Sequence, residues 1–264
     1  MFGSVPAIPR PRNLLLASLP VAELDLLTPH LRRISLRRGA SIAASTSAMV
    51  RICFPETIVA SFGETRRDGT RFDIGMIGRE GLIGWPVLLG LHHSSHSGRV
   101  LLAAGDALVM PADILTELID RHRQLHAWLL RFVQAFTVQM GQTIVANLRD
   151  DLAARLARWL LMLHDRVVGD ILPVTHGELA AALHVRRSSV TDTLHIMEGE
   201  RILRCTRGVV MVRDRAALTA LAGESYGAAE RSYRALVAPF GKTGAVAPAT
   251  TDCRMTAASL LGCS

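Results

Sequence analysis

The spacing of apolar residues changes along the chain and divides it into parts. Between residues 31 and 110 the apolar runs are short and glycine recurs every few positions. Such runs separated by turn residues are typical of strands. The predicted strands are 31–37, 48–54, 57–64, 71–77, 99–104 and 107–110, with a hairpin signal at Arg67-Asp68-Gly69. Several short strands at this spacing predict an antiparallel roll, barrel or sandwich, preceded by short helices over 13–31.

After Pro111 the apolar spacing becomes helical and predicts helices over 112–120, 121–147 and 149–167. The longest carries a stripe at alternating steps of four and three, formed by Leu125, Leu129, Phe132, Phe136 and then Met140 or Thr143. Two copies of a helix use such a seam to pair. The stripe therefore predicts a dimerisation helix, and packing against the chain's own β-domain is the alternative. Both readings can hold together.

The segment from Thr175 to Val212 predicts two helices joined by a tight turn and followed by a β-hairpin. Thr175 and Glu178 fit a capping box at the start of the first helix. His184-Val185 interrupts the helical spacing, and apolar residues resume at Val190. Two β-prone runs follow, joined by a turn in which Gly208 can take a positive φ. This order predicts a helix-turn-helix with a wing.

The polar side of the second helix has the side chains that DNA recognition requires. Arginine can bridge two guanine acceptors, serine and threonine reach bases or phosphates, and aspartate accepts from cytosine. The predicted DNA-binding residues, one of them in the wing, are Arg186, Arg187, Ser188, Ser189, Thr191, Asp192 and Arg207. A helical hairpin in an ordinary core, with these side chains merely solvated, is the alternative.

Composition narrows the class of protein further. The 264 residues are 49% hydrophobic, enough for a sizeable core. No apolar run approaches the ~18 residues of a membrane span, and the N-terminal apolar run is too short for a signal peptide. We therefore expect a cytoplasmic protein without a membrane partner. The four cysteines are scattered, which indicates neither a disulfide framework nor a zinc site. The net charge of +7 is compatible with a nucleic-acid partner.

Several stretches resemble the Crp/Fnr family of bacterial transcription regulators over residues 13–235. They are FPE at 54–56, DG at 68–69, GMIGREGLIGWPVLLG at 75–90 and RLARWLLMLHDRVVGDILPVTHGELA at 155–180. The resemblance implies an α+β fold with an antiparallel β-roll of the cyclic-nucleotide-binding type, a long dimerisation helix and a C-terminal winged helix-turn-helix. The corresponding parts are 13–120, 121–148 and 149–240, followed by a tail over 241–264 that we expect to be disordered.

The resemblance also implies a homodimer that binds a two-fold symmetric site on double-stranded DNA, with RNA polymerase as a further partner. By position, the base-reading residues are Arg187, Ser188 and Asp192, with Ser189 and Thr191 as neighbouring contacts. The family often has arginine where this chain has Asp192, so the preferred DNA sequence should differ from that of its best-known members.

The residues that hold a cyclic nucleotide in such folds are replaced. A Gly-Glu-x-Gly turn becomes Gly81-Leu82-Ile83-Gly84, and leucine cannot accept from a ribose hydroxyl. Ser95 and His96 lie nearest the expected Arg-Ser phosphate pair, and Arg99 is displaced from it. We predict that cyclic AMP is not the effector. The candidate effector pocket is Gly81, Leu82, Gly84, Ser95, His96 and Arg99; the effector is unknown, and no cofactor is predicted.

Other chemistries have weaker support in the sequence. His92, His93 and His96 are potential transition-metal ligands, with a solvated polar loop as the favoured alternative. A cupin-like metalloenzyme would need a Glu soon after a His-x-His pair, and none follows His96 until Glu117. Because no catalytic motif stands out, we expect the chain not to be an enzyme. A binding protein that has lost sensing is a third reading.

Overall fold

The N-terminal part is a β-roll with short helices. The computed structural model describes residues 10–43, 47–67, 71–94, 96–102 and 104–242. Two antiparallel sheets form the roll, in the orders β1-β7-β3 and β2-β6-β4-β5. The elements are α1 (Leu14–Ala17), α2 (Val21–Leu27), β1 (Arg32–Leu36), β2 (Ser41–Ala43), β3 (Arg51–Pro55), β4 (Ala60–Thr65), β5 (Arg71–Ile77), β6 (Ser97–Val100) and β7 (Gly105–Pro111). Each predicted strand overlaps one of these strands, while β2 was not predicted.

The hairpin between β4 and β5 is confirmed by pairing, because Thr65 lies opposite Arg71 in an antiparallel register. Its Asp68-Gly69 turn lies outside the described residues. Asn13 ties the N-terminal helices to the roll: its amide donates to the carbonyls of Pro55 and Gly81, 2.8 Å each, and its oxygen caps α1. The side chain is fully buried and its hydrogen-bonding groups are satisfied.

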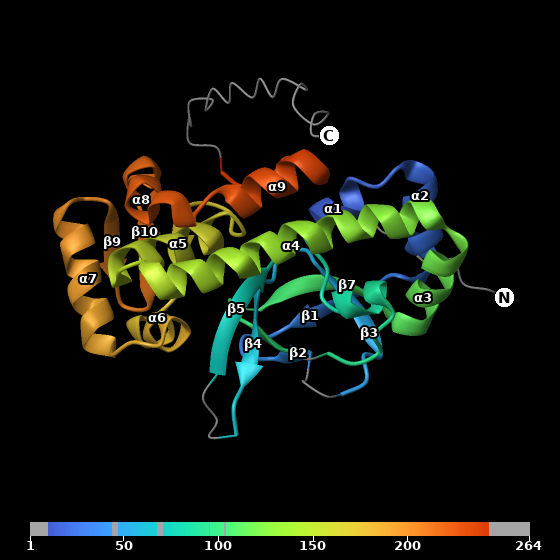
Figure 1. Cartoon of the computed structure of the whole chain (residues 1–264), viewed down its shortest axis with the longest axis horizontal. Coiled ribbons are helices and arrows are strands. Elements are labelled where there is room, and N and C mark those ends of the chain that lie inside the picture. The colour runs from blue at the N-terminus through green and yellow to red at the C-terminus, as the bar shows by residue number, and fades with distance from the viewer. Residues whose placement is uncertain (1–9, 44–46, 68–70, 95, 103, 243–264) are drawn as a thin grey trace, which may run out of the picture.

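Three helices follow the roll. They are α3 (Ala112–Arg121), α4 (Arg123–Arg149) and α5 (Leu152–His164). Helix α4 runs along the length of the molecule, with the roll below it in the view of Figure 1 and α9 beside it. Within the described ranges no helix is both long enough and apolar enough to cross a bilayer.

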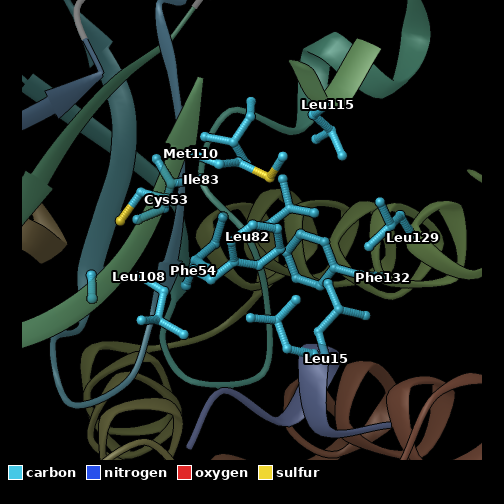
Figure 2. Packing of buried hydrophobic residues seen from close by; sticks show 14 of the residues in the cluster. Leu15, Cys53, Phe54, Leu82, Ile83, Leu108, Met110, Leu115, Leu129 and Phe132 are labelled. Carbon is cyan, nitrogen blue, oxygen red and sulfur yellow. The ribbon is translucent and has the colours of Figure 1, made fainter. Parts of the chain in front are cut away.

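The predicted dimerisation stripe of α4 is buried inside its own chain. Leu125 and Leu129 are fully buried, Phe132 and Phe136 are 2% and 3% exposed, and Met140 packs against the same core. Figure 2 shows Leu129 and Phe132 among roll residues such as Phe54 and Leu82. The stripe thus packs against the chain's own β-domain, the alternative that the sequence left open, and its part in a dimer stays a prediction. The physical reason is that the roll exposes an apolar face that must be covered, and this stripe covers it.

The C-terminal part is a winged helix-turn-helix, and its core cluster also includes Val59, Met76 and Leu102 of the roll. Its remaining elements are β8 (Ile171–Leu172), α6 (His176–Leu183), α7 (Arg187–Gly199), β9 (Leu203–Thr206), β10 (Val209–Val212), α8 (Arg215–Ala222) and α9 (Ala228–Leu236). The wing strands pair antiparallel, with the unpredicted β8 on the outer side of β10. Gly208 has φ of 76°, as predicted for the wing turn. The predicted fold class is confirmed; the tail beyond Lys242 lies outside the described residues.

Candidate nucleic-acid interface

Helix α6 begins with the predicted capping box. The Glu178 amide donates to Oγ1 of Thr175 at 3.2 Å, and Oε2 of Glu178 accepts from the Thr175 amide at 2.8 Å. The helix ends at His184, which has φ of 55° in the left-handed region that glycine normally occupies. The His184 ring stacks on Phe72 of β5 at 4.2 Å between centroids. This contact links the helix-turn-helix to the roll.

The crossing of α6 and α7 is packed and hydrogen-bonded. Val190 and Leu194 of α7 are fully buried, and the small Ala180 of α6 is 6% exposed. Nδ1 of His176 lies 2.9 Å from Oγ1 of Thr191, which itself donates to the Arg187 carbonyl at 3.0 Å. Burial and the nearby Arg187 lower the pKa of His176, which keeps the ring neutral. The Thr191 hydroxyl therefore holds the two helices together.

The outer face of α7 presents polar side chains to solvent. Arg186, Arg187, Ser188 and Asp192 are exposed, while Ser189 and Thr191 are half-buried. His195, which the sequence reasoning missed, is also exposed. It follows Ser188 and Asp192 at the spacing of one helical face, and this spacing was the signal available in the sequence. The face has the size and donors that a major-groove reader needs.

The wing is held beside α7. Oε1 of Glu198 on α7 accepts from the Cys205 amide of β9 at 3.0 Å. Arg204 and Arg207 of the wing are exposed. Burial and Glu198 raise the pKa of Cys205 to about 11, so this residue stays a neutral thiol. The arrangement places further cationic side chains beside the polar face of α7.

Three residues of the predicted effector pocket, Gly81, Leu82 and Gly84, are buried in the roll. Leu82 is fully buried, and Figure 2 shows it in the cluster with Phe54 and Phe132. A Cβ on Gly81 would meet Phe132 at 2.2 Å, and one on Gly84 would meet Ile52 at 2.7 Å. The turn is therefore packed as core, because leucine has replaced a polar residue that would need an open site.

The remaining described residues of that prediction are on β6 or directly before it. His96 is half-buried on the edge of β6, Ser95 lies outside the described residues, and Arg99 lines a cavity between the two domains. His92 and His93 are exposed. Among the described residues no three His, Cys, Asp or Glu side chains group as metal ligands. The described arrangement thus gives no support to His92, His93 and His96 as metal ligands, and that role stays a prediction.

Comparisons with known proteins agree with the geometry. The model of the Crp-like helix-turn-helix domain matches residues 154–221. A protein from Eubacterium rectale assigned to the Crp/Fnr regulators superimposes with a TM-score of 0.61 at 15% identity, covering 79% of this chain and 97% of its own. A Crp-family transcriptional regulator from Thermus thermophilus gives 0.60 at 21% identity, covering 72% and 97%.

The c-di-GMP-responsive global regulator CLP from Xanthomonas campestris gives a TM-score of 0.59 at 14% identity, covering 73% of this chain and 99% of its own. A search among curated protein sequences found no match. The identities with the solved structures are low, so these similarities show the fold.

The fold and the matched domain together define a class. The chain carries a Crp-like helix-turn-helix domain on a roll-and-helix body of the Crp/Fnr type. This confirms the resemblance: residues 154–221 form a Crp-like helix-turn-helix domain, and the fold is that of solved regulators of the Crp/Fnr type.

Proposed function

We propose that the chain is a homodimeric, sequence-specific regulator that binds a two-fold symmetric DNA site. The observation that carries this proposal is the exposed polar face of α7, which lies beside a basic wing at one end of a 27-residue helix. Arg187, Ser188 and Asp192 read bases. Arg186 and the wing residue Arg207 bind phosphates, while Ser189 and Thr191 support these contacts.

The dimer forms along a second stripe of α4, which we call the pairing face. Its residues follow one another at alternating steps of three and four: Ala127, Leu130, Gln134, Thr137, Gly141, Ile144 and Leu148. Leu130 is half-buried, and Ile144 and Leu148 are 60% and 79% exposed. An exposed apolar pair at the end of a coiled-coil repeat is costly in water and favours a partner helix.

A groove beside the pairing face supports the same arrangement. It has a volume of about 730 Å³ and lies between the second half of α4 and the α8 end, with Val138, Val145 and Leu221 among its lining residues. A partner helix on the pairing face would bring its side chains to this groove. Two recognition helices would then lie about 34 Å apart, which is one turn of DNA.

The test is selection of binding sites from a random DNA library with the purified, dialysed protein. We expect a two-fold symmetric motif. Arg187→Ala should weaken binding to that motif by about 1–3 kcal/mol and relax the choice of base at one position of each half-site. Arg51 is an exposed arginine on β3 of the roll. Arg51→Ala is therefore the matched control and should leave the affinity and the choice of base unchanged. The proposal would be contradicted if the selection enriched no motif, both with dialysed protein and with protein in cell extract.

A further inference from the structure

A cavity of about 610 Å³ lies between the roll and the winged domain. This volume is within the range of small-molecule sites, ~300–1,000 Å³. Part of its wall comes from β4, β5 and β6 and from the loops next to β1 and β6, and the rest comes from α5, α6 and the segment between them. The residues that matter for binding are Arg38, Arg71, Arg99, Trp159, Leu163 and Val174.

Arg99 is the cation that the cavity leaves available. Arg71 is engaged, since its Nε donates to Asp73 at 2.8 Å and its Nη2 donates to the carbonyls of Ser61 and Ser97. Arg38 pairs with Glu178. Arg99 is exposed on β6 and makes no ion pair with any described residue. Three guanidinium groups thus face two carboxylates, so the cavity keeps a surplus positive charge.

The opposite wall is apolar. Leu163 is fully buried, Val174 is 4% exposed, and the half-buried Trp159 adds an aromatic side chain to the same lining. An inorganic ion would leave this wall without a partner. A ligand that carries both an anionic head and an apolar body would fill the site and pair Arg99, because both kinds of surface gain from contact.

We propose that this cavity binds a small organic carboxylate with an acyl or aryl body. The carboxylate pairs with Arg99, and the body packs on Trp159, Leu163 and Val174. The site differs from the effector pocket predicted from the sequence, with which it shares only Arg99. It is an effector site only if the proposed DNA-binding function holds; the binding itself does not depend on that function.

Occupancy of this cavity acts on the orientation of the DNA-binding domain because the walls belong to two domains. One side is closed by the Phe72–His184 stack and the Arg38–Glu178 pair. A ligand that contacts both walls stabilises this docked arrangement over any in which the domains separate. Binding then shifts the population of arrangements by the difference in its affinity for them.

The test uses the full chain without DNA and three probes. The fluorescent anion 8-anilinonaphthalene-1-sulfonate reports occupancy, and octanoate and its uncharged analogue octanol compete with it. We expect one saturable site, at which octanol competes about tenfold or more weakly than octanoate. Arg99→Gln should weaken octanoate by about tenfold, which is about 1.4 kcal/mol, and leave octanol unchanged. Arg51→Gln is the matched control.

Three results would overturn the site: no saturable octanoate binding, equal competition by octanol, or unchanged octanoate affinity in Arg99→Gln. The DNA affinity of the selected motif is then measured with and without octanoate. If octanoate changes the DNA affinity of the parent protein but not that of Arg99→Gln, the cavity is coupled to DNA binding. If octanoate changes the DNA affinity of neither protein, that coupling is contradicted. If no DNA motif is selected while octanoate still binds, the proposed DNA-binding function is contradicted and the proposed ligand site is not.

Discussion

The two stripes of α4 have similar spacing and opposite environments. Leu125, Leu129, Phe132 and Phe136 are buried in the roll, whereas Ile144 and Leu148 of the pairing face are largely exposed. The more apolar stripe belongs to the chain's own core, and the less apolar one stays exposed on the single chain. An apolar stripe therefore does not by itself identify a dimer seam, because the same stripe can cover the chain's own sheet.

The largest effect should come from the buried stripe. Phe132→Ala removes a ring that packs on Phe136 and against the turn at Gly81. We expect it to lower the free energy of unfolding by about 3–5 kcal/mol, since large-to-small core changes leave a cavity. Urea denaturation measures this, with Gln134→Ala on the pairing face as control. A loss within experimental error would show that the ring is not the core element the structure describes.

Changes on the pairing face should weaken the dimer and leave the fold of the single chain intact. Leu148→Glu combined with Ile144→Glu places charges on the proposed seam. We expect about a tenfold or larger rise in the dimer dissociation constant, equivalent to about 1.4 kcal/mol, measured by analytical ultracentrifugation. Circular dichroism should report an intact fold for the monomer, because both side chains are exposed within one chain. A dimer that persists at equal strength would exclude this seam.

These two regions show what the sequence could predict. The spacing identified α4, the Thr175–Glu178 capping box located α6, and Gly208 located the wing turn, because each is a local signal. The choice between the stripes of α4 is not local, since it depends on which face meets a sheet formed by a distant part of the chain. The two stripes have the same spacing, so periodicity cannot separate them.

The cavity was beyond sequence reasoning for the same reason. Arg38, Arg99 and Trp159 meet only when the two domains dock. The residues predicted for the effector site were chosen by position along the chain, and Leu82 lies in the core instead. Strands β2 and β8 are three and two residues long, too short to show a period. No sequence pattern indicated that Arg99 lines a cavity with residues of the winged domain.

A smaller effect should come from Gly141, an exposed glycine inside α4 on the pairing face. A Cβ there would meet no described atom within 4 Å apart from the backbone of its own helix. Gly141→Ala should therefore stabilise an isolated protomer by about 0.5–1 kcal/mol, because glycine is a poor helix former. If a partner helix approaches closely at this point, the same change should weaken the dimer. Gly177→Ala, near the start of α6, is the control, and equal effects on monomer and dimer would contradict close approach.

The smallest expected effect is a pH dependence of stability that arises from His164, outside both stripes of α4. His164 at the end of α5 is 2% exposed; its Nδ1 accepts from Arg215 at 2.8 Å, and its Nε2 therefore carries the proton and lies 2.8 Å from Oδ1 of Asp170. Burial, the largest cause, lowers the pKa of His164. The unfolded chain then binds a proton more readily than the folded one, so stability should fall as the pH drops below about 6.5, the ordinary histidine value.

The measurement is urea denaturation at a series of pH values from about 8 to about 5, on either side of the ordinary histidine pKa, comparing the parent with His164→Asn. His176 and His184 also have pKa values lowered first by burial and titrate in the same direction, so only the difference between the two proteins isolates His164. The free energy of unfolding of His164→Asn should fall less steeply with decreasing pH than that of the parent. Identical pH profiles would show that His164 does not contribute to the pH dependence of stability and that the neutral ring between Arg215 and Asp170 is not its cause.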